Sequence, residues 1–491
     1  MTTDGKSLVA NLLEELADSG VEYCHFKSNC NLDTALEGVG DLDLLVSNKH
    51  ASKLLTILGR LRFRRAVGPA WSTSPFVFHF YGCDPHSGRL IHLHVYLRLV
   101  TGGALYKNHW VNAESMLLSE SKPHSRDGIF IPSSETELFV FIIRKAIEQT
   151  SILEHLLFWK GFVAAKREFE WLSEASDLQR VEELRAKWFP NVPSQLLTDA
   201  RMAMFQNRSV IARIIAGYRV RRCFRMTMAP AWVVSLKRML ILGQSYVRDR
   251  LRLRQSSRGL STGGRVVAFV GPDGAGKSTL VGAIADWFGH DFKVKRIHLG
   301  KPVHCWRTWP FWVSIRVLWA LRRALLKVVP RENMLGVHES KPAGYVPATN
   351  PVIAWLNSID RLAAVRRCIR FAARGTLVIC DRFPSTIARA PDGPRIESGG
   401  GRLRRAVAAR EQHNYQLIPD PDIEVRVVAA FELTLARNAA RSAPEPEEVM
   451  RRRYELTRLL IFPGAHTISI DTAQPLDQTL IKLKKALWEA I

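Results

Sequence analysis

The pattern of apolar and polar positions differs between the two ends of the chain. From residue 264 onward, short runs of β-branched and other apolar residues alternate with longer segments of helical period. This order is typical of a parallel sheet whose strands are joined by crossover helices. The sequence therefore predicts a doubly wound α/β domain with a five-stranded parallel sheet over 264–491. The five runs are RVVAFV, KVKRIHL, TLVIC, DIEVRVVAA and HTISI.

Residues 1–200 show another arrangement. An amphipathic helical segment comes first, strand-like runs follow, and helical periodicity extends from Ser133 to Phe189. The helical part opens on SSETELF, which has the form of a capping box. This order predicts an α+β domain with a helical extension. Its strand-like runs are VEYCHFKS, DLDLLVS and LIHLHVYLRL.

Residues 201–263 form a basic helical connector in this interpretation. Between Arg201 and Arg265 the chain carries fifteen Lys or Arg residues and one acid, Asp249, which is +14 of the net charge of +24. Such a strip attracts nucleic acid or an anionic membrane surface. A solvated linker whose arginines pair with acidic faces of the flanking domains explains the same composition, and both interpretations stay open.

Length and composition limit the remaining classes. A chain of 491 residues is too long for one core of usual size, so two or three domains are expected. Seven cysteines without C-x-x-C spacing favour neither a disulfide framework nor a zinc site, and the first residues lack the basic start of a signal peptide. Charged residues interrupt the most apolar stretches, so no membrane span is expected. These observations predict a cytoplasmic protein.

The strongest motif is GPDGAGKS at Gly271–Ser278, which matches G-x-x-x-x-G-K-[ST] and follows a predicted strand. In such a loop, backbone N–H groups and a helix N-terminus surround phosphates. Lys277 would reach the outer phosphates and Ser278 would ligate magnesium. ATP and Mg²⁺ are therefore the expected cofactors. The expected cofactor-binding residues are Gly271, Gly274, Ala275, Gly276, Lys277, Ser278 and Thr279.

A second motif indicates which class of protein with a phosphate-binding loop this chain resembles. In GTLVICDRFPST an apolar strand ends at Asp381, from which a carboxylate can orient magnesium, and Arg382 follows. Together with the acidic loop GPDGAGKST and the final strand ISIDTAQP, this part of the chain resembles the thymidylate kinase family of nucleoside monophosphate kinases. The resemblance covers about residues 264–491. It is thin between Lys301 and Pro351, where that family places much of its acceptor site.

The resemblance implies a reaction and roles for particular residues. The reaction is transfer of the γ-phosphoryl group of ATP to a nucleoside monophosphate, dTMP by resemblance, or to a related small acceptor. Asp273 would face an acceptor hydroxyl, Asp381 would hold metal-linked water, and Arg382 would contact the acceptor phosphate. Arg361 matches a further family arginine for that phosphate, although its helix carries other arginines and is equally typical of surface charge. The oligomeric state stays open, and the resemblance allows a dimer.

This chain lacks an arginine that some members of the family carry in the loop, so a catalytic arginine is expected elsewhere. Some members carry an arginine just after the loop acid, where this chain has Gly274. Phosphoryl transfer needs cationic help on the transferred group, and members without the loop arginine take it from a lid after the fourth strand. Arg437 and Arg441, four residues apart before a proline-rich stretch, are the expected lid residues. The alternative for this region is a plain salt-bridged helix around Arg451–Arg453.

The front domain carries a weaker motif. HFKSNCNLDTALEGVGDLDLLVS resembles nucleotidyltransferases of the polymerase-β type, in which a glycine-serine turn precedes an Asp-x-Asp strand. Asp41 and Asp43 alternate on a strand, so both carboxylates point to one side and could hold two magnesium ions. Lys27-Ser28 replaces the usual turn, and His92 stands where a third carboxylate is expected. An altered nucleotide-binding module is therefore as well supported as a working transferase.

His92 and His94 allow two interpretations. They lie two residues apart on a predicted strand and could ligate a metal from one face. Because the sequence shows no further ligands at suitable spacing, hydrogen-bonded histidines are the favoured interpretation. Two other functions compete with the kinase: an ATP-binding regulatory module that docks through 201–265, and a nucleotidyltransferase that works through the front domain.

Overall fold

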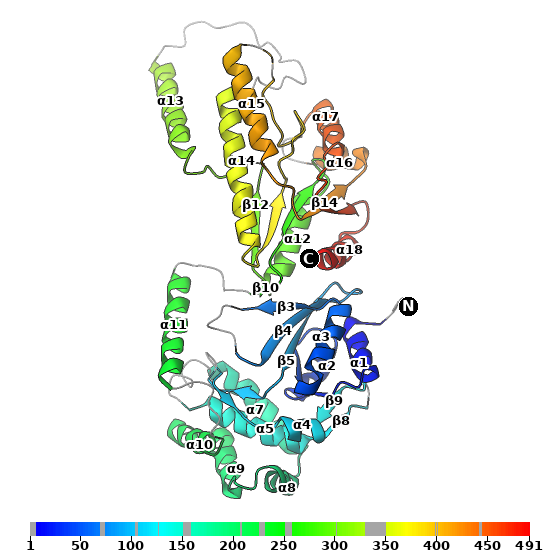
Figure 1. Cartoon of the computed structure of the whole chain (residues 1–491), viewed down its shortest axis with the longest axis vertical. Helices are drawn as coiled ribbons and strands as arrows, with labels where there is room; N and C mark the ends of the chain where they lie inside the picture. Colours follow the sequence, from blue (N-terminus) through cyan, green and yellow to red (C-terminus); the bar gives the residue numbers. More distant parts are fainter. Residues whose placement is uncertain are drawn as a thin grey trace. The chain divides into compact units, whose positions relative to one another are not determined.

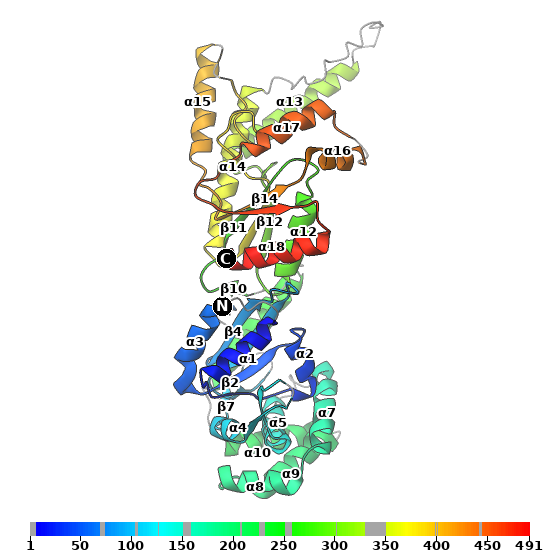
Figure 2. The same cartoon turned by 90° about the vertical axis from the view of Figure 1, so that its right-hand side faces the viewer.

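The chain folds into two compact units, Met1–Ser261 and Thr262–Ile491 (Figures 1 and 2). The boundary lies two residues before the one expected from the sequence, and each unit has its own buried apolar core. The computed structural model describes residues 6–68, 74–103, 107–125, 127–150, 159–206, 209–224, 231–250, 258–300, 302–328, 350–397, 399, 401–440 and 444–491.

The first unit contains a six-stranded mixed sheet in the order β1-β2-β5-β4-β3-β10. β2 and β5 run parallel, and the other neighbouring strands run antiparallel. Ile91, Leu93 and Val95 of β5 belong to the core that α1 and α3 close, and they alternate with His92 and His94, which face the other side of the sheet. The bounds are α1 (Leu8–Asp18), β1 (Tyr23–His25), α2 (Leu32–Leu36), β2 (Leu42–Val46), α3 (Ala51–Arg60), β3 (Arg64–Val67), β4 (Val77–Cys83), β5 (Leu90–Tyr96) and β10 (Gly259–Leu260).

Helices make up most of the remainder of the first unit. The central helix, α5, begins after Ser133, whose hydroxyl accepts from the N–H of Thr136. Ala203, Ala216 and Val220 lie in the predicted connector, but they are buried in the same core as α5. Apolar burial ties α10 to this core, and the first unit extends to Ser261, so it includes nearly all of the predicted connector. The bounds are α4 (Glu114–Ser119), α5 (Ser134–Glu148), α7 (Trp159–Glu174), α8 (Leu178–Trp188), α9 (Ser194–Arg201), α10 (Val210–Cys223) and α11 (Ala231–Arg250).

The second unit contains the predicted five-stranded sheet, in the order β12-β13-β11-β14-β15, and all of its strands are parallel. Helices lie on both faces of it, so the doubly wound arrangement is confirmed (Figure 1). Its strands are β11 (Val266–Val270), β12 (Val294–His298), β13 (Leu377–Asp381), β14 (Ile423–Val428) and β15 (His466–Asp471). Its helices are α12 (Lys277–Gly289), α13 (Trp309–Val328), α14 (Pro351–Ala372), α15 (Arg402–Gln416), α16 (Phe431–Ala439), α17 (Glu447–Arg458) and α18 (Leu476–Ala490).

Helices pack on both faces of the sheet, which leaves the ends of the strands as the place where a site can form. Val365 and Cys368 of α14 pack with Cys380 of β13 on one face, whereas α12 and α18 meet through Phe288 and Trp488, whose ring centroids are 6.0 Å apart. From β11 the chain runs first to strands on one side and later to strands on the other. The carboxyl end of β11 therefore lies at a topological switch point, where open α/β sheets bind ligands.

Candidate functional site

The phosphate-binding loop joins β11 to α12, as predicted. α12 begins directly after Gly276, which has a φ of 89° and supplies no side-chain cap. An uncapped helix start has N–H groups that can turn to a ligand, and the helix dipole there favours an anion. Gly274 also has a φ of 89°, and a Cβ added there would lie 2.9 Å from the Thr434 carbonyl oxygen. An arginine at this position would therefore be strained and crowded.

A cavity of about 650 Å³ opens at this loop. Small-molecule sites range from roughly 300 to 1,000 Å³, so the cavity is large enough for a nucleotide. Gly271, Ala275 and Arg361 are not among its lining residues. The predicted residues that line it include Asp273, Lys277, Ser278, Asp381, Arg382 and Arg437. The polar lining residues that the sequence did not single out include His298, Glu445, Arg453 and Thr472.

Lys277 lies within the loop, with a nearly buried side chain. Its ammonium donates to the carbonyl oxygens of Gly271, at 2.8 Å, and Pro272, at 2.7 Å. It also lies 3.8 Å from the carboxylate of Asp273. The loop thus surrounds the ammonium, which is the arrangement from which the lysine of such a loop reaches the outer phosphates of a nucleotide.

Ser278 and Asp381 meet at the carboxyl end of β13. The Ser278 hydroxyl oxygen lies 3.5 Å from Oδ2 of Asp381. The strand register places His298 of β12 beside Asp381, and its Nδ1 lies 3.4 Å from the same carboxylate oxygen. Hydroxyl and carboxylate oxygens suit Mg²⁺, whose remaining ligands are usually water and substrate phosphates. The donors present therefore fit a magnesium ion between Ser278 and Asp381.

Asp273, the acidic residue of the loop, lies between two arginines from distant segments. Its carboxylate is 2.9 Å from the guanidinium of Arg382 and 3.3 Å from that of Arg453. Burial alone would raise the pKa of Asp273, but the positive charges of Arg382, Lys277 and Arg453 outweigh it and hold the pKa below its usual value. Asp273 is therefore an ionised carboxylate that gathers cations at the edge of the loop.

Arg382 links the loop to a second carboxylate. Its φ is 66°, which is uncommon for a residue with a side chain, and its guanidinium also lies 3.7 Å from Asp392. Asp392 is buried and accepts from Arg361 at 2.8 Å. Two acidic partners therefore hold the Arg382 guanidinium at the cavity wall. The sequence alone did not single out Asp392.

Arg361 is buried, so its interpretation as a surface charge is wrong. Its guanidinium donates to the hydroxyl of Tyr415, to the carboxylate of Asp392 and to the carbonyl of Gly300. These contacts position Asp392 and, through it, Arg382. Contact of Arg361 with an acceptor phosphate stays a prediction.

Arg437 extends from α16 to the loop. Its guanidinium lies 3.4 Å from the carbonyl oxygen of Gly274 and 3.0 Å from that of Thr472. Arg437 also lines the cavity, so its cation is available to a bound ligand. Arg441, the other expected lid residue, lies outside the described residues.

α17 presents two arginines with different surroundings. Arg451 forms an exposed ion pair with Glu447 at 2.8 Å, which agrees with a plain salt-bridged helix. Arg453 instead lines the cavity, where it contacts Asp273 and pairs with Glu445 at 2.6 Å. A charge pattern on the sequence does not separate these two arginines, because only the packing of α17 decides which of them turns to the cavity.

Of the two carboxylates predicted in the front domain, Asp43 lies on β2 and Asp41 directly precedes it, and both contact histidines of β5. Asp43 has a nearly buried side chain and contacts Lys27 at 2.8 Å and His94 at 3.0 Å. Asp41 contacts His92 at 2.7 Å. Both carboxylates thus have protein partners in this structure, and their role as magnesium ligands stays a prediction.

The turn that precedes these carboxylates contacts acidic side chains. Ser28, with a φ of 59°, donates its N–H to Glu168 at 3.2 Å, and Asn29 donates its N–H to Glu137 at 3.2 Å. Burial raises the pKa of Glu137 to about 7, against the opposing effect of the hydrogen bonds from Asn29. A turn whose N–H groups already meet carboxylates is a poor phosphate cradle, which favours an altered module over a working transferase.

The connector has one buried and one exposed part. α10 packs into the first unit, whereas α11 exposes Trp232, Met239 and Tyr246 by 70%, 72% and 72%. Within the described ranges, no helix combines the length and the apolar character needed to cross a membrane. Contact of 201–265 with nucleic acid or an anionic membrane stays a prediction.

Two curated proteins of Escherichia coli (strain K12) are similar to part of the chain. One is the uncharacterized ATP-binding protein YghR, which is 25% identical over 228 residues, or 45% of this chain and 86% of YghR. The other is the uncharacterized ATP-binding protein YghS, which is 27% identical over 242 residues, or 47% of this chain and 95% of YghS. No family model matches the chain. More than half of this chain therefore lies outside the similarity to either relative.

Proposed function

We propose that the second unit binds ATP together with Mg²⁺ and transfers the γ-phosphoryl group to a nucleoside monophosphate or a related small phosphorylated acceptor. The names of YghR and YghS support the ATP part. The loop at 271–279 and its cavity support it independently. The observation that carries the transfer part is the pair of Asp273 and Arg382 beside that loop.

The loop supplies most of the groups that would bind ATP, the phosphoryl donor. The backbone N–H groups at the start of α12 would hold the β-phosphate, and Lys277 would exchange its carbonyl contacts for the outer phosphates. Ser278 and Asp381 would hold the metal ion, with His298 beside Asp381. A bound Mg²⁺ would supply charge neutralisation on the phosphate oxygens.

Asp273 and Arg382 are the residues that would bind the acceptor. A module that only binds ATP needs the loop and the metal ligands, whereas this site adds an ion pair at its edge. Arg382 offers a cation for the phosphate of an acceptor, and Asp273 offers an oxygen for its hydroxyl. Phe383 and Leu460 line a narrow space of about 20 Å³ next to the pair. That space holds roughly one water, so an acceptor ring requires it to widen.

Transfer itself would rest on positioning and charge. An oxygen of the acceptor phosphate forms the new bond to the γ-phosphorus while the bond to the β,γ-bridging oxygen breaks, so the products are ADP and a nucleoside diphosphate. Negative charge on the transferred group needs a cation nearby. Arg437 and Arg453 both line the cavity and can supply it, and Arg441 is a third candidate.

The test uses the full chain with Mg²⁺ and ATP labelled at the γ position. The protein is incubated with a panel of ribo- and deoxynucleoside monophosphates, and the products are separated by chromatography. We expect label in a nucleoside diphosphate, lost in Lys277→Ala and kept in Lys485→Ala, which removes an exposed lysine of α18. Absence of labelled diphosphate with every monophosphate would refute the nucleoside monophosphate kinase.

A parallel reaction with ATP labelled at the α position tests the front domain. The kinase proposal predicts that no acceptor becomes labelled in that reaction. Labelled product that disappears in the double variant Asp41→Ala/Asp43→Ala would instead assign nucleotidyl transfer to the first unit. The two labels therefore separate the two activities in one protein preparation.

We further propose that α11 attaches the protein to an anionic membrane surface. The observation that favours this is the exposure of Trp232 and Tyr246 on a helix that also carries basic residues, a composition found at membrane interfaces. Co-sedimentation with phosphatidylserine vesicles should exceed that with neutral vesicles and fall as salt rises. Equal sedimentation with both vesicle types would refute the attachment, and retention on duplex DNA alone would move the function to nucleic acid.

A further inference from the structure

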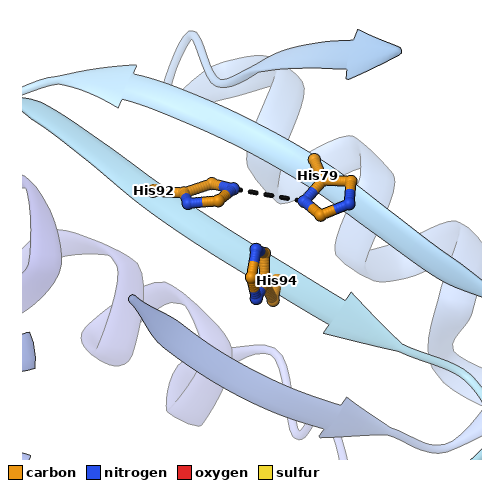
Figure 3. A group of neighbouring side chains, drawn as sticks. All are labelled: His79, His92 and His94. Carbon is orange, nitrogen blue, oxygen red and sulfur yellow. Dashed lines mark hydrogen bonds between the residues drawn. The ribbon is translucent and has the colours of Figure 1, made fainter. Parts of the chain in front are cut away.

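Three neighbouring strands of the first unit direct polar side chains to one face. The register places Asp43 of β2 opposite His94 of β5, and His94 opposite His79 of β4. Two residues along, His92 lies on the same face of β5, because side chains alternate along a strand. Figure 3 shows His92 and His94 projecting from one strand and His79 from the next. The sheet thus brings together three imidazoles that no local sequence motif connects.

The three rings are close enough to share one ion. One nitrogen or more of each ring lies within 4.8 Å of a nitrogen of each other ring. Nδ1 of His79 and Nε2 of His92 are already 3.2 Å apart (Figure 3). Zn²⁺ binds imidazole nitrogens at about 2.0–2.1 Å in tetrahedral geometry, so two such nitrogens lie roughly 3.3 Å apart. The pair of His79 and His92 meets that spacing, and small side-chain rotations would bring His94 to it.

Two carboxylates orient the rings. Nδ1 of His92 lies 2.7 Å from Asp41, and Nδ1 of His94 lies 3.0 Å from Asp43. A carboxylate at Nδ1 keeps the proton on that nitrogen and directs the lone pair of Nε2 away from it. Metal-ligating histidines usually have such a partner, which fixes the ring and raises its basicity. Lys27 in turn holds Asp43 at 2.8 Å.

One ring nitrogen of His94 is unsatisfied. The Nε2 atom of His94 is buried and has no hydrogen-bond partner among the residues that the structure describes. A buried nitrogen without a partner costs free energy unless another group satisfies it. A metal ion beside Nε2 of His94 and Nε2 of His92 would satisfy both lone pairs.

We propose that His79, His92 and His94 bind one divalent transition-metal ion of the zinc type. The ligands are Nε2 of His92, Nε2 of His94 and Nδ1 of His79, whose proton moves to its other nitrogen. Imidazole ligands favour zinc and its neighbours over Mg²⁺, which prefers oxygen. Three protein ligands leave a fourth position for water or a substrate oxygen. Asp41 and Asp43 then act as positioning residues for the ligands.

The test measures metal binding by the full chain, independently of any activity. Protein stripped with a chelator is dialysed against Zn²⁺ in the presence of excess Mg²⁺, and bound zinc is counted by atomic emission. Titration with Co²⁺ then reports tetrahedral coordination through its visible absorption. We expect one bound ion per chain and a tetrahedral cobalt spectrum in the wild type.

Matched variants locate the ion. His94→Ala should lose the cobalt spectrum and the tightly bound zinc, and Asp41→Ala, which changes an exposed carboxylate, should weaken binding roughly 10- to 100-fold with every ligand still present. His86→Gln changes an exposed histidine outside the cluster and should bind like the wild type. Zinc binding that is unchanged in both His94→Ala and Asp41→Ala would overturn the site. So would the absence of stoichiometric binding by the wild type at up to about 100 µM zinc.

Discussion

The carboxylate of Asp273 lies 2.9 Å from the guanidinium of Arg382, although the two residues are 109 positions apart. One belongs to the loop after β11 and the other follows the end of β13, and these strands are neighbours in the sheet. The contact therefore joins the loop expected to hold a donor nucleotide to the residue expected to hold an acceptor. The predictions below follow from this arrangement.

Lys277→Ala should weaken ATP binding strongly. The ammonium is held inside the loop, and its removal takes away the only charge that the loop motif itself directs at the outer phosphates. We expect the dissociation constant for ATP, measured by isothermal titration, to rise at least about 30-fold, which corresponds to roughly 2 kcal/mol. Lys485→Ala makes the same charge change at an exposed position and should leave the constant unchanged. A similar constant in wild type and Lys277→Ala would place ATP elsewhere.

Arg453→Ala and Arg451→Ala compare two arginines of the same helix. Arg453 reaches Asp273 and lines the cavity, whereas Arg451 pairs with Glu447 at the surface. Loss of a cation near the transferred group should lower kcat at least about 10-fold in Arg453→Ala. Arg451→Ala should stay within about 2-fold of the wild type, because exposed ion pairs contribute little. Equal effects of the two changes would show that Arg453 acts only on the stability of α17.

Asp381→Asn should raise the Mg²⁺ concentration required for half-maximal turnover. The carboxylate beside Ser278 is the oxygen ligand that the loop cannot replace. We expect an increase of roughly 10-fold or more, measured by titrating Mg²⁺ at saturating ATP. Asp286→Asn, on the exposed side of α12, is the control. An unaltered Mg²⁺ requirement in Asp381→Asn would remove Asp381 from the metal site.

Much of the second unit could be predicted because its signals are local. Each strand is a short apolar run, and the loop motif announces a strand before it and a helix after it. His298 and Arg453 were missed because their place in the site depends on contacts between distant segments. The register of β12 against β13 brings His298 to Asp381, and the packing of α17 brings Arg453 to Asp273.

In the first unit, too, one residue of the proposed site can be placed only from contacts between distant segments. β4 was not predicted, although Val77, His79 and Tyr81 alternate with aromatic residues as expected for a strand. Without β4 the sequence offers no third ligand beside His92 and His94, so it favours hydrogen-bonded histidines. Only the pairing of β4 with β5 places His79 opposite His94.

Glu137 should make the stability of the first unit depend on pH. The folded protein keeps a proton on this buried carboxyl up to about 7, whereas the unfolded chain releases it near 4.5. The folded state therefore binds more protons between these values, and the free energy of unfolding falls as pH rises through the window. The full effect is roughly 3 kcal/mol, since one pKa unit corresponds to about 1.4 kcal/mol.

Urea unfolding at pH 4.5 and pH 7, followed by circular dichroism, checks this dependence. Glu137→Gln cannot ionise, so its free energy of unfolding should fall less than that of the wild type between the two pH values. Glu174→Gln, at an exposed position, should behave like the wild type. The same fall in Glu137→Gln and in the wild type would show that Glu137 is ionised in the folded protein throughout the window.

Asp273→Ala tests the central claim most directly, because it separates donor binding from acceptor use. Asp273 contacts the two arginines at the loop edge, and the phosphates of ATP are assigned to backbone N–H groups and Lys277. We predict that kcat/KM for the acceptor falls at least about 100-fold, while the dissociation constant for ATP changes less than about 3-fold. If both quantities worsen by the same factor, Asp273 only shapes the loop and the separation of donor and acceptor at this site is wrong.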